Sequence, residues 1–397
     1  MISMPVDFIR AMVWAALLTA TLAATACGGG TRPVTPGPEP EVVVTPTEPE
    51  LLLPGHLETW RPLLERLQSD GFDPYIVADL LNQPGAGFDP SPMSRKLETL
   101  YRLLFESERT KEIQRGLAML GYDVGPDDGM AGSHTRGAIR EFQELHYLDV
   151  DGEPTEELLS AIRHDLAKPP EARPVPTGVH GKGEDGPRVH ESALRPEVIT
   201  KAREFMAANR AALNRVESMY GVPPEIVTAI LTVETRIGEN MGYDNAFVIL
   251  SSMALSRDLN VIEPYLWQHG FTTEERDFLR EKAREKGDWA YQELTSLLTH
   301  CRDQGTNPLA FPSSIYGAVG ICQFMPSNIL LYGVDGDMDG DVDLFSMADA
   351  VMSVGSYFAG HGWRTGLDEE GQRDVVHSYN HSTIYVNTIM TLAGRLR

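Results

Sequence analysis

The residue best placed to do chemistry is Glu234, a carboxylic acid at a position that the sequence otherwise gives to the core. Residues 220–238 predict a short helix, with prolines suited to its start and Gly238 suited to a left-handed end. The apolar stripe of that helix comprises Ile226, Val227, Ile230 and Leu231. Glu234 is the next position on the stripe. Apolar surroundings would raise its pKa, so that the carboxyl group stays protonated near neutral pH and can act as a general acid.

A second interpretation gives Glu234 no chemical role. The side chain would then end the helix in water, or pair with Arg203, Arg215 or Arg236. The helix alone fits both interpretations, so other stretches of the chain have to decide between them.

Two further stretches have the composition of a site for a polar ligand. In residues 311–328, the small residues Gly317 and Gly320 allow close approach of the backbone, and Gln323 offers both a donor and an acceptor. Residues 378–382 combine an aromatic ring, an amide and hydroxyls, which suits a sugar. The glycine-rich stretch by itself is also compatible with a tight structural turn.

The chain resembles the membrane-bound lytic murein transglycosylases of type B in three segments with matching order and spacing. These are Val-Glu-Thr-Arg-Ile-Gly (233–238), Gly-Ala-Val-Gly-Ile-Cys-Gln-Phe-Met-Pro-Ser (317–327) and Tyr-Asn-His-Ser (379–382). The resemblance covers about residues 194–397 and implies a mainly α, goose-lysozyme-like catalytic domain. It also implies that the glycan is bound by Ser314, Gln323, Tyr379 and Asn380.

The chain departs from the family pattern at three positions. Val319 and Cys322 stand where many relatives carry Met and Gly, and Ile237 stands where many carry Trp. None of these changes removes the acid, so they put the shape of the sugar subsites in doubt rather than the activity.

The activity implied by the resemblance is cleavage of the β-1,4 bond between N-acetylmuramic acid and N-acetylglucosamine, leaving a 1,6-anhydromuramyl end. One Glu suffices if the substrate's acetamido group stabilises the oxocarbenium-like centre, with Glu234 acting first as acid and then as base. No cofactor is needed for this chemistry. Two alternatives are a lysozyme in which water completes the reaction, and a non-catalytic wall-binding or scaffolding protein. The sequence does not distinguish exo from endo action.

Residues 110–167 resemble a small three-helix peptidoglycan-binding domain. The resemblance rests on the pattern Asp-Gly-x-x-Gly-x-x-Thr-x-x-Ala-Ile-x-x-Phe-Gln, from Asp128 to Gln143. The alternative is a helical spacer that binds nothing, since a fold does not guarantee a function.

The other segments predict the organisation around these two units. Residues 51–109 show helical periodicity and are expected to pack on the catalytic domain, residues 168–193 are a linker by composition, and residues 194–397 form the catalytic domain. No long strand-like alternation is present, which favours a mainly α protein.

The first 27 residues predict export from the cytoplasm. An apolar run precedes Cys27, which resembles the lipidated residue of a bacterial lipobox, and residues 28–50 have the composition of a tether. We therefore expect a periplasmic lipoprotein anchored to the outer membrane, with ordinary cleavage or an uncleaved anchor as alternatives. The expected partners are glycan strands, the membrane through the lipid and other cell-wall enzymes. A net charge of −23 argues against nucleic acid as a partner.

The two cysteines after Cys27 predict a covalent link. In an oxidising compartment, Cys301 and Cys322 predict a disulfide, worth roughly 3 kcal/mol on the chain-entropy model, with two buried free thiols as the alternative.

The acidic loop resembles the start of an EF-hand and predicts a structural calcium ion. Its ligand candidates are Asp335, Asp337, Asp339 and Asp341, and Gly340 takes the sixth place. The twelfth place is Ser346 instead of Glu, and with Asp349 it could equally form a capping box. We therefore expect weak affinity.

Overall fold

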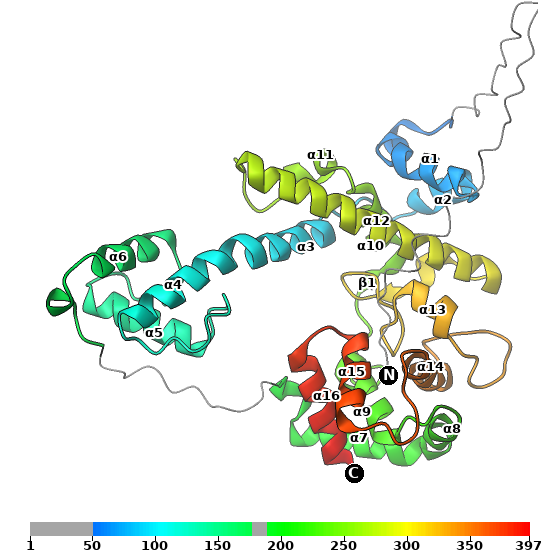
Figure 1. Cartoon of the computed structure of the whole chain (residues 1–397). Helices are drawn as coiled ribbons and strands as arrows, with labels where there is room; N and C mark the ends of the chain where they lie inside the picture. Colours follow the sequence, from blue (N-terminus) through cyan, green and yellow to red (C-terminus); the bar gives the residue numbers. More distant parts are fainter. Residues whose placement is uncertain (1–50, 177–188) are drawn as a thin grey trace, which may run out of the picture. The chain divides into compact units, whose positions relative to one another are not determined.

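The structure is a computed structural model that describes residues 51–176 and 189–397 (Figure 1). The predicted export signal, Cys27 and the tether lie outside the described residues. The mainly α prediction is confirmed, because the strands β1 (Asp244–Asn245) and β2 (Pro312–Ser313) have two residues each and pair antiparallel. Within the described ranges, no helix is long and apolar enough to cross a membrane.

The first helices share one hydrophobic core with the C-terminal half of the chain. Helix α3 contacts both α10 and α12, and α1 also contacts α10. This part comprises η2 (Gly55–Trp60), α1 (Arg61–Ser69), α2 (Pro74–Leu81), α3 (Ser91–Tyr101), α10 (Ala246–Leu255), α11 (Leu259–Ile262), η6 (Glu263–Tyr265) and α12 (Thr273–Gln304). Helix α12 begins with a capping box formed by Thr272 and Glu275.

A second, separate core belongs to residues 107–166. It is built by α4 (Ser107–Met119), α5 (Ser133–Leu145) and α6 (Glu156–Leu166), which bury Ile113, Leu117, Ile139, Phe142 and Ile162. Helix α4 continues from α3 through the π-helical segment η3 (Arg102–Glu106). Three helices around their own core match the prediction for this segment.

Part of the predicted linker has regular structure. Residues Pro170–Ala172 form the 3-10 helix η4, and the Arg173 side chain donates back to the carbonyls of Leu166 and Lys168. At the other end, η5 (Glu191–Ala193) follows His190, whose N–H donates to Thr388 Oγ1.

The remaining helices surround α9 (Pro224–Thr235), which carries Glu234. Helices α7 (Pro196–Ala208), α8 (Arg210–Tyr220), α14 (Met347–Gly360) and α16 (Thr383–Leu396) all contact α9. The others are η7 (Pro308–Ala310), α13 (Pro326–Tyr332) and α15 (Glu369–Tyr379). The four predicted stripe residues of α9 are fully buried.

Helix α9 ends three residues before the predicted stop at Gly238. Arg236 (φ 54°), Ile237 (φ 63°) and Gly238 (φ 85°) are all left-handed. The Ile237 N–H donates to the Leu231 carbonyl, and Thr235 Oγ1 accepts from the Gly238 N–H. Two non-glycine residues in this conformation are held by their surroundings, as is common beside functional sites.

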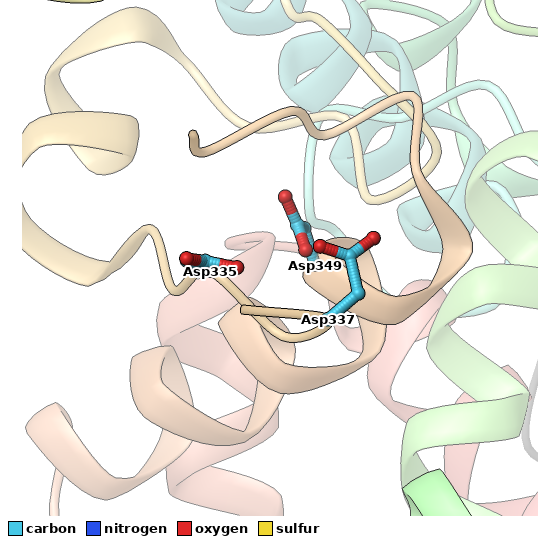
Figure 2. Close-up of side chains that lie close together, drawn as sticks. All are labelled: Asp335, Asp337 and Asp349. Carbon is cyan, nitrogen blue, oxygen red and sulfur yellow. The ribbon is translucent and has the colours of Figure 1, made fainter. Parts of the chain in front are cut away.

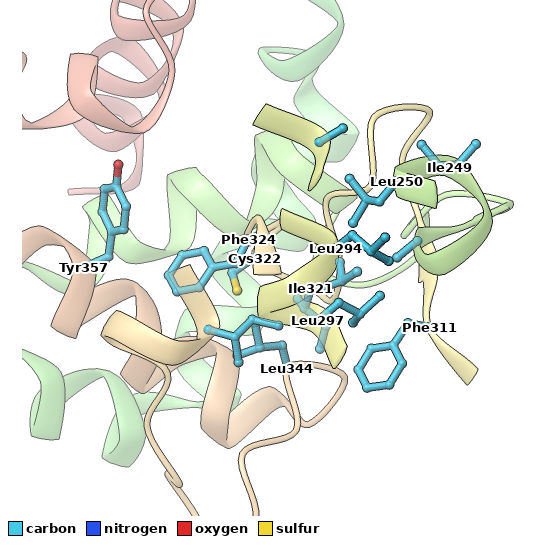
Figure 3. Close-up of a cluster of buried hydrophobic side chains, with 14 of the residues drawn as sticks. Ile249, Leu250, Leu294, Leu297, Phe311, Ile321, Cys322, Phe324, Leu344 and Tyr357 are labelled. Carbon is cyan, nitrogen blue, oxygen red and sulfur yellow. The ribbon is translucent and has the colours of Figure 1, made fainter. Parts of the chain in front are cut away.

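The predicted disulfide between Cys301 and Cys322 is not formed. Both cysteines are free and buried, which was the alternative prediction. Cys322 lies within the apolar cluster that also contains Phe324 and Leu344 (Figure 3). Burial raises the pKa of the Cys301 thiol to about 11 and that of the Cys322 thiol further, so both stay protonated and behave as small apolar side chains.

Candidate active site

Glu234 lies in the last turn of α9, in surroundings that favour its neutral form. Burial is the main cause that raises its pKa from 4.5 to about 7, and a hydrogen bond from Tyr385 partly offsets that effect. Among the residues that the structure describes, no charged side chain contributes to this shift. The side chain is still partly accessible. The alternative of an ion pair with arginine is wrong, since Arg203 and Arg215 bond to backbone carbonyls and Arg236 is exposed.

Tyr385 on α16 is the hydrogen-bond partner of Glu234. Its hydroxyl donates to Glu234 Oε1 over 2.6 Å, and the residue is buried. Burial, and then the nearby Glu234 carboxylate, raise the pKa of Tyr385 well above its usual value, so the phenol remains a donor. Sequence analysis missed this residue because its spacing on α16 is that of an ordinary core position.

The glycine-rich stretch forms a folded loop from Ser313 to Phe324. The Ser314 N–H donates to the Ala318 carbonyl, and Ser314 Oγ accepts from the Ala318 N–H over 3.1 Å. Val319 and Phe324 then exchange two backbone hydrogen bonds. Gly317 and Gly320 have positive φ and leave no room for a Cβ, as their packing against Leu250 and Leu344 shows.

Gln323 is held at the turn of this loop in a left-handed conformation, with φ 52°. Its side-chain amide donates to the Gly320 carbonyl over 3.0 Å and to the Met241 carbonyl over 3.4 Å. The residue therefore joins the loop to the segment after α9, and its half-buried position is compatible with a role in ligand binding.

Two hydroxyls fix the loop beside Glu234. Thr235 Oγ1 donates to the Ile321 carbonyl over 2.8 Å, and Tyr379 Oη donates to the Cys322 carbonyl over 2.5 Å. The Tyr379 ring also packs on Phe324 and Tyr357. Its hydroxyl is thus occupied by the backbone, so Tyr379 supports the loop. Asn380 is exposed and occupies the position just after the end of α15.

Tyr243 is an exposed aromatic residue that sequence analysis did not single out. It follows Gly242, where a Cβ would overlap the Ser313 carbonyl, and precedes Asp244, which pairs with Ser313. Its neighbours on both sides therefore pack against the strand that leads into Ser314. Tyr243 itself is 96% exposed.

The acidic loop brings together a different set of carboxylates from the one predicted. Oxygens of Asp335, Asp337 and Asp349 lie within 4.8 Å of one another (Figure 2). Asp339 and Asp341 do not join this group, and Asp339 Oδ1 instead accepts from the Asp341 N–H.

Asp349 supplies the acid that the twelfth loop position lacks. It is buried, and its carboxylate accepts from the N–H groups of Gly336 and Asp343. Burial, followed by the charges of Asp337 and Asp335, raises its pKa. The predicted capping box is absent, because Ser346 Oγ donates to Asp337 and makes no cap bond. Three carboxylates with converging oxygens suit a hard divalent cation such as calcium.

Comparison with known proteins identifies the two units. Residues 188–373 match the family model described as a transglycosylase SLT domain. Residues 106–162 match a peptidoglycan binding domain model. The transglycosylase domain model ends before Tyr379, Asn380 and Tyr385, so this match does not cover them.

The chain is homologous to the membrane-bound lytic murein transglycosylase B of Escherichia coli (strain K12). The two are 31% identical over 179 residues, which is 45% of this chain and 42% of the relative. The match therefore spans less than half the length of that relative.

Two solved structures are also similar to the chain. E. coli lytic transglycosylase Slt35 in complex with calcium is 24% identical, with a TM-score of 0.43, over 53% of this chain and 80% of that one. Soluble lytic transglycosylase SltB1 from Pseudomonas aeruginosa is 23% identical, with a TM-score of 0.42, over 66% of this chain and 97% of that one.

Proposed function

We propose that the protein is a lytic transglycosylase that cleaves the β-1,4 bond between N-acetylmuramic acid and N-acetylglucosamine in peptidoglycan. The observation that carries this proposal is Glu234, a buried acid with a pKa of about 7 that accepts a hydrogen bond from Tyr385, in a segment that matches a transglycosylase domain. Such a group is protonated often enough at neutral pH to be an acid, and ionised easily enough to be a base.

The proposed mechanism uses Glu234 twice. Its proton passes to the glycosidic oxygen, the C1–O bond breaks with its electron pair moving to that oxygen, and the substrate's acetamido group stabilises the cationic centre. The Glu234 carboxylate then takes the proton of the sugar's 6-hydroxyl, whose oxygen bonds to C1. The product is a 1,6-anhydro end, and Glu234 is again protonated. Ser314, Gln323, Tyr379 and Asn380 would bind the glycan.

The experiment that tests the reaction is mass spectrometry of the muropeptides that the purified protein releases from sacculi. Anhydro ends are expected. Reducing ends would show a lysozyme-type hydrolase, and no release at all would favour a wall-binding or scaffolding protein.

We expect Tyr243 to stack on a sugar ring at the edge of this site. Replacing Tyr243 with Ala should raise KM about two- to tenfold with little change in kcat, if stacking on a sugar is worth as much as the about 0.5–1.5 kcal/mol of an aromatic pair. Kinetics on soluble glycan strands measure this, with Tyr75→Ala as a control at another exposed tyrosine. An unchanged KM would remove Tyr243 from the site.

A structural calcium ion at Asp335, Asp337 and Asp349 is also part of the proposal. Calcium should raise the melting temperature, since a cation would neutralise the three converging carboxylates, and saturation at 100 times Kd adds about 2.7 kcal/mol. Asp349→Asn should abolish the calcium-dependent rise, whereas Asp341→Asn, outside the group, should keep it. Each variant is compared with and without calcium, which separates ion binding from any effect on the loop itself. Equal melting temperatures of the unaltered protein in both conditions would exclude the ion.

The remaining proposals concern location and the second unit. Residues 1–27 support export to the periplasm and anchoring to the outer membrane through a lipid on Cys27. Residues 106–162 would hold the enzyme on glycan strands. Palmitate labelling, compared between the full chain and a Cys27→Ser variant, tests the anchor.

A further inference from the structure

A lysine from the N-terminal helices reaches the loop that carries Ser314. The Lys96 ammonium, on α3, lies 4.6 Å from the centre of the Tyr316 ring. Tyr316 belongs to the tight turn of Ser314, because its N–H donates to Ser314 Oγ over 3.4 Å. Residues 220 positions apart in the chain therefore meet beside a proposed glycan-binding residue.

The Lys96 ammonium has no acidic partner in the described parts of the chain. No carboxylate among residues 51–176 and 189–397 forms an ion pair with it, and the side chain is half-buried. Burial lowers the pKa of Lys96, and the like charge of Lys286 lowers it further. Its exposed neighbour Arg95 also makes no ion pair with a described residue.

Lys282 on α12 differs from Lys96 because it has an acidic partner. Its ammonium also faces an aromatic ring, that of Phe278 at 5.9 Å, yet it pairs with Glu285 over 2.7 Å. Contact with a ring does not by itself prevent an ion pair, so the missing acid at Lys96 is a property of that site.

We propose that Lys96, with Arg95 beside it, binds a carboxylate of the peptide that N-acetylmuramic acid carries in peptidoglycan. The inference rests on the proposed function, since it assigns a subsite to the same substrate. In intact strands the lactyl group of the muramyl unit is amide-linked to the peptide, so the free carboxylates belong to the peptide. A half-buried cation with no carboxylate beside it gains more from such an anion than a fully hydrated one.

The test compares two substrates, glycan strands with their peptides and strands stripped by an amidase. Lys96→Met keeps the apolar length of the side chain and removes the charge. It should lower kcat/KM about tenfold on peptide-bearing strands, mainly through KM, and leave stripped strands unaffected, because a charge-assisted contact is worth about 1.5 kcal/mol or more. Lys96→Arg should retain activity, and Lys282→Met is the matched control that should change neither substrate.

Binding to the Glu234→Gln protein gives a second readout that needs no turnover. Titration of soluble peptide-bearing fragments should show an affinity about tenfold weaker when Lys96→Met is added. Equal losses on both substrates would mean a structural role for Lys96, and a loss confined to stripped strands would mean a lactyl carboxylate. Either result overturns the inference. If the unaltered protein releases no anhydro products, the proposed function fails, and the titration still decides whether Lys96 binds the peptide.

Discussion

Glu234→Gln protein should bind cell wall but release no anhydromuropeptides. The amide has the shape of the carboxyl group yet can neither give the proton to the leaving oxygen nor take one from the 6-hydroxyl. Loss of general acid–base catalysis costs about 10²- to 10⁴-fold. Mass spectrometry of released products and a pull-down on sacculi measure the two properties. A variant that still cuts at the rate of the unaltered protein would assign the acid to another residue.

The same substitution should make the protein more stable at alkaline pH. The folded pKa of Glu234, about 7, is above its unfolded value of 4.5. The proton is therefore held more tightly in the folded state, and stability falls as pH rises from about 4.5 through about 7. Gln has no such dependence. The shift of about 2.5 pKa units corresponds to about 3 kcal/mol, so the variant should gain up to that amount at pH 8 and little at pH 4. Thermal unfolding at both pH values checks the sign.

Tyr385→Phe is expected to have the second largest effect, a fall in kcat of about tenfold to a hundredfold. A hydrogen bond to a charged group contributes about 1.5–3 kcal/mol, and the Tyr385 hydroxyl makes one with Glu234 whenever the carboxylate forms. Without it the pKa of Glu234 should rise above about 7, because the bond favours the ionised form. Activity that needs the protonated acid is lost as pH rises through this pKa, so the alkaline limb of the pH–rate profile should move to higher pH.

Tyr357→Phe is the matched control for this profile. The Tyr357 hydroxyl donates to the Ser378 carbonyl over 2.8 Å, so the variant also loses one hydrogen bond of a buried tyrosine. It should lower the melting temperature and leave the alkaline limb in place. If Tyr385→Phe behaves in the same way, Tyr385 has only a structural role.

The acid could be predicted from the sequence, and its partner could not. Glu234 interrupts an apolar stripe at helical spacing, which is visible within one helix. Tyr385 follows such a stripe on α16, with Ile389, Leu392 and Leu396, and so has the pattern of a core residue. That its hydroxyl meets Glu234, 151 positions away, follows only from the packing of α16 on α9.

In the metal loop and at the cysteines, too, spacing along the chain does not predict which side chains meet in the fold. Asp335 and Asp337 were predicted from loop spacing, but Asp349 enters from the first turn of α14, outside the spacing rule. Two cysteines about 20 positions apart are close enough along the chain for a bridge. Whether they form one depends on the direction of their side chains, and here each thiol packs separately in the core.

The core shared by α1–α3 and the C-terminal helices has a consequence for the order in which the protein can fold. Leu64, Leu67, Met93 and Leu97 share a core with elements that begin beyond residue 190, and the three-helix unit of residues 107–166 lies between these two parts in the sequence. That unit has a complete core of its own and can fold as soon as it emerges. The first helices can bury their apolar side chains only after roughly half the chain has been made, because contacts at such sequence separation form late. The N-terminal apolar surface therefore stays exposed to solvent while the rest of the chain is made, and a chaperone that covers it is expected to speed folding more than one acting on the central unit.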